Sequence, residues 1–95
     1  MFVGVAEVEI HIPYAQSLKE KRRVLKKILD SVRNKFPVSV AEIESKDLWQ
    51  HAVIGVSIVS GDKIVIDSIF QRMSVFIDEM NICEIIAFNK EIFSW

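Results

Sequence analysis

Apolar and polar residues alternate over the first twelve positions of the chain. Apolar or small residues occupy the even positions from Phe2 to Ile12, whereas the odd positions include the carboxylates Glu7 and Glu9. A period of two residues is typical of a strand with one buried face. We therefore expect a strand over this range, with its even positions toward a core and its end at Pro13.

The period becomes helical after Ser17. Ser17 and Glu20, three residues apart, have the spacing of a capping box. In this motif the side chain of each residue accepts a hydrogen bond from the backbone N–H of the other at the start of a helix. Apolar residues at 100° per residue then form one stripe, with Val24 at its margin: Leu18, Leu25, Ile28, Leu29 and Val32. The pattern predicts a helix from Ser17 to about Asn34 that buries this stripe.

Two further strands are predicted to form a hairpin. The first covers Val38–Glu44, a short turn covers Ser45–Leu48, and the second covers Trp49–Ser60. In the second of these strands one face is apolar: Ala52, Ile54, Val56 and Ile58. That face is expected to meet the same core as the first strand.

Asp62 is the predicted N-cap of a second helix that runs to about Met80. Its core stripe has helical spacing: Ile66, Ile69, Phe70, Met73, Ile77 and Met80. The remaining segment, Ile82–Trp95, is rich in β-branched and aromatic residues and predicts a fourth strand. The pattern alone leaves open which face of that strand is buried.

The predicted order is β-α-β-β-α-β, which indicates an α+β, ferredoxin-like domain over residues 1–95. In this fold a four-stranded antiparallel sheet carries two helices on one face. Right-handed crossovers place the first strand beside the third. A chain of 95 residues is large enough for one core and thus for one domain.

Composition narrows the class of protein. Hydrophobic residues make up 51% and charged residues 26%, which excludes a disordered or collagen-like chain. The single cysteine, Cys83, excludes an intrachain disulfide and fits a reducing compartment. Neither a signal peptide nor an uncharged apolar run of ~20 residues is present. These features predict a cytoplasmic protein that does not associate with a membrane.

Charge is unevenly distributed along the chain, although the net charge is only −1. The segment from Ser17 to Lys35 contains eight Lys and Arg residues and two carboxylates, a local charge of +6, so the remaining residues carry −7. Cations in the first helical turns oppose the helix dipole at a cost of ~0.3 to 1 kcal/mol per exposed charge. They are either a solvated helix face, with aliphatic stems over apolar surface, or a site for RNA or another anion. The candidates are Lys19, Lys21, Arg22, Arg23, Lys26 and Lys27.

Valines mark a candidate interface on the sheet face away from the helices. The predicted patch consists of Val3, Val5, Val38, Val40, Val53 and Val59. Exposed contiguous apolar surface usually marks an interface, and a two-fold homodimer is its simplest closure. RNA recognition by the sheet itself is disfavoured, because the central strands lack the aromatic side chains on which bases stack.

Two histidines suggest a weaker, third interpretation. His11 and His51 are expected to lie near several polar or aromatic neighbours: Glu9, Glu42, Glu44 and Trp49. Imidazole and carboxylate suit zinc or manganese, so a metal or hydrolytic site is possible chemically. No ligand spacing is diagnostic, and an open antiparallel sheet normally exposes polar residues. We therefore predict no metal and no cofactor.

Motifs of common enzyme classes are absent from the sequence. It has no Gly-rich phosphate loop, no G-x-S-x-G and no H-E-x-x-H. Ser17 is explained as a helix cap and needs no role as a nucleophile. The sequence thus predicts a protein without catalytic residues.

Several short motifs together resemble the YlxP-like family of small bacterial proteins, a domain-of-unknown-function family. The resemblance covers about the first two thirds of the chain. In order, the motifs lie at Val3-Gly4, Ser17–Leu25 (S-L-K-x-K-R-x-V-L), Ser39–Glu42 (S-V-A-E), Asp47 with Gln50 and Ala52, and Val59-Ser60 with Asp62.

The resemblance implies a ferredoxin-like fold, a bacterial cytosolic protein and a role associated with the ribosome. It implies no catalytic residues and assigns no task to its motif positions. Two hypotheses follow. The first is a non-enzymatic factor that binds ribosomal RNA or a ribosomal particle through the basic first helix. The alternative is a homo-oligomerising interaction module that uses the apolar sheet face.

Overall fold

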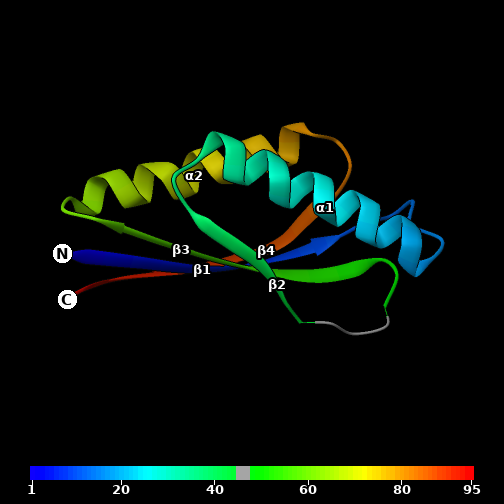
Figure 1. Cartoon of the computed structure of the whole chain (residues 1–95), viewed down its shortest axis with the longest axis horizontal. Coiled ribbons are helices and arrows are strands. Elements are labelled where there is room, and N and C mark those ends of the chain that lie inside the picture. The colour runs from blue at the N-terminus through cyan, green and yellow to red at the C-terminus, as the bar shows by residue number, and fades with distance from the viewer. Residues whose placement is uncertain (45–47) are drawn as a thin grey trace.

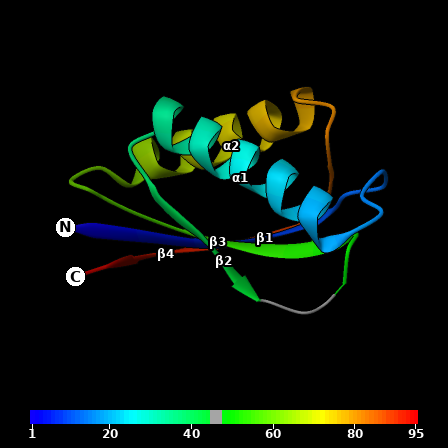
Figure 2. The same ribbon diagram turned by 45° about the vertical axis from the view of Figure 1, so that its right-hand side comes forward.

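The computed structural model describes residues 1–44 and 48–95. The elements are β1 (Phe2–His11), α1 (Leu18–Lys35), β2 (Ser39–Glu44), β3 (His51–Ser60), α2 (Lys63–Glu79) and β4 (Glu84–Ser94). The four strands form one antiparallel sheet in the order β2-β3-β1-β4, and both helices cover the same face (Figures 1 and 2). The ferredoxin-like fold is thus confirmed, including the predicted position of the first strand beside the third.

β1 is a central strand of the sheet and pairs along its whole length with β3 on one side and β4 on the other. Its register with β3 runs from Phe2 opposite Ser60 to His11 opposite His51. Val8 and Ile10 have no exposed surface, as expected for even positions that face the helices. The odd positions, in consequence, lie on the open face of the sheet.

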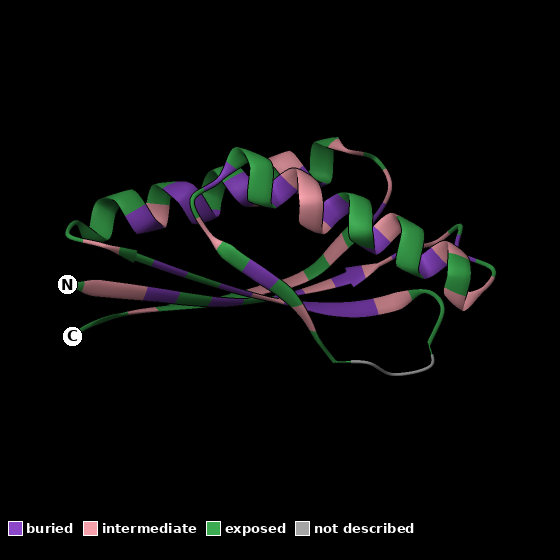
Figure 3. Ribbon diagram, in the orientation of Figure 1, coloured by how far each residue is buried: buried purple, intermediate pink, exposed green. Residues whose placement is uncertain are grey.

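The core lies between the helices and the sheet (Figure 3). Most of the two predicted stripes are buried in it: Leu25, Ile28, Val32, Ile66, Ile69, Phe70, Met73 and Ile77. Leu29 and Met80 are partly buried at its margin. Within the described ranges, neither helix is long and apolar enough to cross a membrane.

The start of α1 departs in one detail from the predicted capping box. The Ser17 hydroxyl accepts the Glu20 N–H at 3.1 Å, as expected. The Glu20 carboxylate, however, accepts the N–H of Gln16 at 2.7 Å instead of that of Ser17. The reciprocal bond is therefore displaced by one residue into the preceding loop, which fixes that loop against the first turn of the helix.

α2 determines which face of β4 is buried. Ile85, Phe88 and Ile92 pack against the core, and the Phe88 ring lies 6.0 Å from that of Phe70 in an edge contact. Between Ile85 and Ala87 the pairing with β1 shifts, which leaves Ile86 as an extra, exposed residue. This bulge interrupts the two-residue period, and the sequence pattern could not reveal the buried face for that reason.

β2 is a short edge strand with an irregular end. Its pairing with β3 shifts between Glu42 and Glu44. Residues 45–47, which include most of the predicted hairpin turn and the motif residue Asp47, lie outside the described residues. The antiparallel pairing of β2 and β3 agrees with the predicted hairpin.

Candidate functional site

The outer face of α1 is densely positive. Five of the six candidate cations are exposed: Lys19, Arg22, Arg23, Lys26 and Lys27. At 3.6 residues per turn these five positions fall within an arc of about 140° and along about 12 Å of helix. We call these five residues the α1 basic face. The spacing brings them together on one side of one rigid element, beside the helix N-terminus.

Lys21 does not belong to this surface, which corrects the predicted set. Its side chain is only 5% exposed, and its Nζ lies 3.7 Å from Glu42 Oε2 of β2. The reason is helical geometry, since position 21 is three residues after Leu18 and four before Leu25, on the apolar stripe. Two positions of the family motifs, Lys21 and Glu42, therefore meet as an ion pair that holds α1 to the edge strand.

Asp30 partly neutralises one end of the α1 basic face. Its carboxylate lies 2.8 Å from Lys26 Nζ and 3.2 Å from Arg33 Nη1. The hydrogen bond from Lys26, together with the nearby charges of Lys26 and Arg33, lowers the pKa of Asp30. Arg33 also donates through Nη2 to the Val40 carbonyl at 3.0 Å. Arg33, like Lys21, thus connects α1 to β2.

The groove between α1 and β2 is mixed in charge. It has a volume of about 310 Å³, and its walls carry Arg22, Lys26 and Arg33 but also Asp30 and Glu42. In contrast, no ion pair is found for Lys19, Arg22, Arg23 or Lys27 within the described part of the chain. Of these four cations only Arg22 borders the groove, so most of the uncompensated positive charge is on the outer side of the helix.

Three apolar side chains form a row at one end of the open sheet face. Val3 of β1 lies opposite Val59 of β3 and opposite Phe93 of β4. Val59 is 62% exposed and Phe93 is 42% exposed, and Val5 lies in the next position along β1 on the same face. We call Val3, Val5, Val59 and Phe93 the apolar patch. Phe93 was missed from the sequence because the face of β4 was undecided.

The other predicted interface valines lie elsewhere. Val40 is 6% exposed and pairs with Val56, so it belongs to the helix-covered face. Val38 packs against the same core, and Val53 is buried within the sheet. The expectation that these three belong to an exposed patch is wrong. The alternation in β2 predicts two faces but does not say which one meets the helices.

The two histidines are neighbours, each with its own carboxylate. His11 and His51 are register partners on β1 and β3. His51 Nε2 lies 2.7 Å from Glu9 Oε1, and His11 Nδ1 lies 3.4 Å from Glu84 Oε2. Over residues 1–44 and 48–95, no group of three or more His, Cys, Asp or Glu side chains is placed to hold a metal ion.

The polar partners predicted for this cluster are thus only partly correct. Glu9 joins the histidines, whereas Glu42 faces Lys21. Trp49 and Leu48 are half-exposed and line a shallow hollow with the two imidazoles. Glu84 was not anticipated, because it lies on the strand whose faces the sequence pattern left open. The arrangement is therefore that of two hydrogen-bonded cross-strand pairs, each of one histidine and one glutamate.

Comparison with known proteins identifies relatives of this chain. Residues 3–90 match a family model described as "Protein of unknown function (DUF503)". The uncharacterized protein YlxP of Bacillus subtilis (strain 168) is 47% identical over 76 residues, which cover 80% of this chain and 83% of YlxP. Neither description attaches an activity, substrate or partner to the family.

Solved structures add information on the fold alone. The de novo designed protein Foldit4 aligns with a TM-score of 0.55 at 22% identity over 98% of both chains. A structural genomics protein, YJCS, aligns with a TM-score of 0.50 at 12% identity over 94% of this chain and 96% of its own. The sequence match over most of the chain is much more specific, and it shows that the chain belongs to the DUF503 family of proteins of unknown function.

Proposed function

We propose that this protein is a non-enzymatic cytoplasmic factor that binds structured RNA, such as ribosomal RNA or a ribosomal particle, through the α1 basic face. The observation that carries the proposal is a set of exposed cations, four of them without an ion pair among the described residues, on one side of a single helix. Their position near the helix N-terminus adds free backbone N–H groups that also favour anions.

The expected contacts are to the phosphate backbone. Lys and Arg side chains that neutralise phosphates release counterions, so affinity falls steeply with salt, with a slope of about −0.9 per phosphate on a duplex. Five such contacts would weaken binding roughly 10²- to 10³-fold between about 50 mM and about 200 mM salt. Phosphate contacts position a protein without reading sequence, so RNA shape would determine the target.

The open sheet face is unsuited to this task. Glu7 and Glu9 lie on β1, a central strand, and repel phosphates. No Phe, Tyr or Trp of β1 or β3 is available there for stacking, since Phe2 is at an even position. The imidazoles of His11 and His51 lie on this face, but each is paired with a carboxylate. The RNA would therefore contact the helix-covered side of the molecule, opposite the sheet-based mode of RNA-recognition domains.

The test is binding to purified ribosomal subunits and to naked ribosomal RNA over a salt series. The variant Lys19→Glu/Arg23→Glu is expected to lose saturable binding while its circular dichroism is unchanged. The matched control, Lys63→Glu/Arg72→Glu, changes the net charge equally but alters α2. Equal losses in both variants would show a net-charge effect and overturn the proposal, as would the absence of saturable binding by the unaltered protein.

A second candidate function, homo-oligomerisation, is favoured by the apolar patch. Its side chains lie in adjacent register positions across three strands, and half-exposed apolar surface of this kind usually marks an interface. Sedimentation of the unaltered protein should then show a dimer, and Val59→Glu should convert it to a monomer. Ile64→Glu, at an exposed position of α2, is the control. A monomer at all concentrations would exclude this function.

A further inference from the structure

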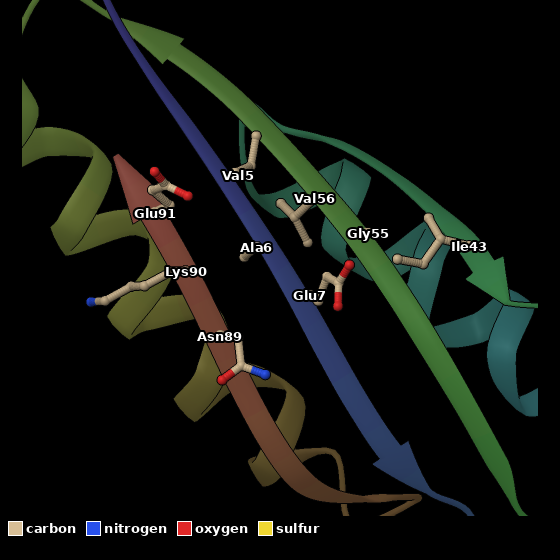
Figure 4. Close-up of a pocket in the computed structure, with 9 residues that line it drawn as sticks. All are labelled: Val5, Ala6, Glu7, Ile43, Gly55, Val56, Asn89, Lys90 and Glu91. Atoms are coloured by element: carbon tan, nitrogen blue, oxygen red, sulfur yellow. The ribbon is translucent and has the colours of Figure 1, made fainter. Parts of the chain in front are cut away.

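The middle of the open sheet face is hollowed around Gly55. Gly55 of β3 lies between Ala41 of β2 and Glu7 of β1, so two successive positions across the sheet carry little or no side chain. The hollow has a volume of about 420 Å³, and Val5 and Ile43 stand at its sides (Figure 4). We call it the Gly55 trough.

Ile43 depends on the absence of a side chain at Gly55. A Cβ atom at Gly55 would lie 2.5 Å from Ile43 Cγ2, so the Ile43 side chain occupies space that any other residue would need. The Ile43 side chain thus lies over Gly55 and forms one side of the trough, and Val5 lies on another side. An unbranched hydrocarbon chain fits such a surface.

Two carboxylates give the trough its charge. Glu7 lies opposite Gly55, and Glu91 of β4 lies opposite Val5. Figure 4 shows the Glu7 carboxylate beside Gly55. Lys90 also lines the trough, but its side chain extends toward α2. Lys90 Nζ is held there by Asp67 Oδ1 at 2.6 Å. Neither Glu7 nor Glu91 has a cationic partner among the residues that the structure describes.

We propose that the Gly55 trough is the docking site for an arginine- or lysine-bearing segment of a partner protein. The aliphatic stem of a basic side chain lies along Ile43 and Val5, and its charged head meets the Glu7 carboxylate. Glu91, opposite Val5 on β4, offers a second carboxylate to the next basic side chain of the segment. Arginine suits this geometry best, because guanidinium–carboxylate bonds are charge-assisted and often bidentate. The proposal concerns the face opposite the α1 basic face and does not depend on RNA binding.

Charge complementarity selects this occupant over two others. A second copy packed face to face over the trough would bring Glu7 and Glu91 against the same residues of its partner, and like charges at an interface are costly. RNA is repelled for the same reason. A basic protein segment instead neutralises the carboxylates, in agreement with the charge of −7 outside the Ser17–Lys35 segment.

The three glycines of the chain allow a direct test. Protein labelled with ¹⁵N-glycine gives three amide signals, from Gly4, Gly55 and Gly61. The probe is the peptide acetyl-Val-Arg-Val-Arg-Val-amide, and the same peptide with Glu in place of Arg is the control. We expect a saturable shift of the Gly55 signal with the arginine peptide alone and no shift of Gly61, which lies in the turn before α2 and has no atom within 4 Å of an added Cβ.

Substitutions distinguish binding at the trough from a general effect of the protein's negative charge. Glu7→Gln/Glu91→Gln should lower the affinity for the arginine peptide about tenfold or more, a loss of about 1.4 kcal/mol or more in binding free energy. Glu79→Gln, at an exposed position of α2, should change nothing. An unmoved Gly55 signal at millimolar peptide, an equal response to the glutamate peptide, or unchanged affinity in the double variant would overturn the proposal. A Gly55 signal that shifts with protein concentration alone would also overturn it, in favour of a second copy.

Discussion

The side chain of Lys21 shows how burial divides a run of basic residues into two roles. Its neighbours in the sequence, Lys19 and Arg22, are exposed, whereas Lys21 lies on the buried stripe of α1 against Glu42. A charge in this position is retained because it has a partner, and loss of the partner leaves a desolvated charge. Charge-reversal experiments on the α1 basic face should therefore omit Lys21, since they would otherwise report on folding.

A pair of substitutions at Lys21 should reveal this structural role. Lys21→Met keeps the aliphatic stem and is expected to cost about 1 kcal/mol or less, because Glu42 remains partly solvated. Lys21→Glu sets two carboxylates together and should cost about 3 kcal/mol or more. Urea unfolding measures both, with Lys19→Glu as the exposed control, expected within about 0.5 kcal/mol of the unaltered protein. Equal stability of Lys21→Glu and Lys19→Glu would contradict the buried placement.

Cys83 should make the protein less stable in alkali. Burial, with smaller contributions from Asp78 and Glu84, raises the pKa of the thiol from 9.0 to about 11. The thiolate is thus disfavoured in the folded chain, and the stability that this provides is complete below about pH 9 and is lost as the pH rises toward about 11. Urea midpoints over this range check the direction. Cys83→Ala, which has no thiol, should lose less stability over the same interval.

At the scale of elements, β1 and α2 approach each other closely at Gly4. Gly4 lies beneath α2, and a Cβ there would be 2.5 Å from Ile66 Cγ2 and 3.0 Å from the Phe70 ring. Both neighbours are fully buried, so neither has free space in which to move. The glycine of the Val3-Gly4 motif is thereby explained by packing between two elements.

Gly4→Ala should accordingly destabilise the protein by about 1 to 3 kcal/mol through overpacking of this contact. Gly61→Ala is the matched control, because nothing lies within 4 Å of the added methyl group, and it should be close to neutral. Thermal or urea unfolding of the two variants distinguishes them. Similar stability of both variants would mean that α2 moves away from β1 at little cost.

Elements with an unbroken period could be predicted from the sequence. The alternation of β1 and the stripes of both helices have the predicted burial, because each pattern matches one regular geometry. β2 and β4 were less predictable, since bulges shift the period and the buried face depends on which helix lies above it. The errors at Val38 and Val40 and the omission of Phe93 and Glu84 arose because the sequence pattern does not contain this tertiary information.

At the scale of the whole molecule, the two faces of the sheet differ in sign. The helix-covered side carries the α1 basic face, and the open side carries Glu7, Glu9 and Glu91. The candidate cations themselves were evident from the sequence, but their separation from these carboxylates needed the fold. Although its net charge is small, a molecule with separated charges can bind an anionic surface through its positive face and a cationic surface through its negative face.

Retention on a cation exchanger at pH 7 tests this separation. With a pI near 6.1 the protein would be expected to pass through, but the α1 basic face should retain it at low salt. Lys19→Glu/Arg23→Glu should elute without retention. The control Lys63→Glu/Arg72→Glu has the same net charge and should still be retained. Identical elution of the two variants would show that net charge alone governs binding.

β1 and β4 meet at their outer ends, where the Trp95 N–H donates to the Met1 carbonyl at 2.7 Å. Phe2 and Ser94 are register partners, so the strand pair with the greatest separation along the chain has its ends side by side (Figure 1). A short glycine linker from Trp95 to Met1, with new ends opened at Gly61, would turn this pair into a local hairpin. The sheet would be unchanged, but its most distant pairing would close early, and the circular permutant should fold faster than the parent chain.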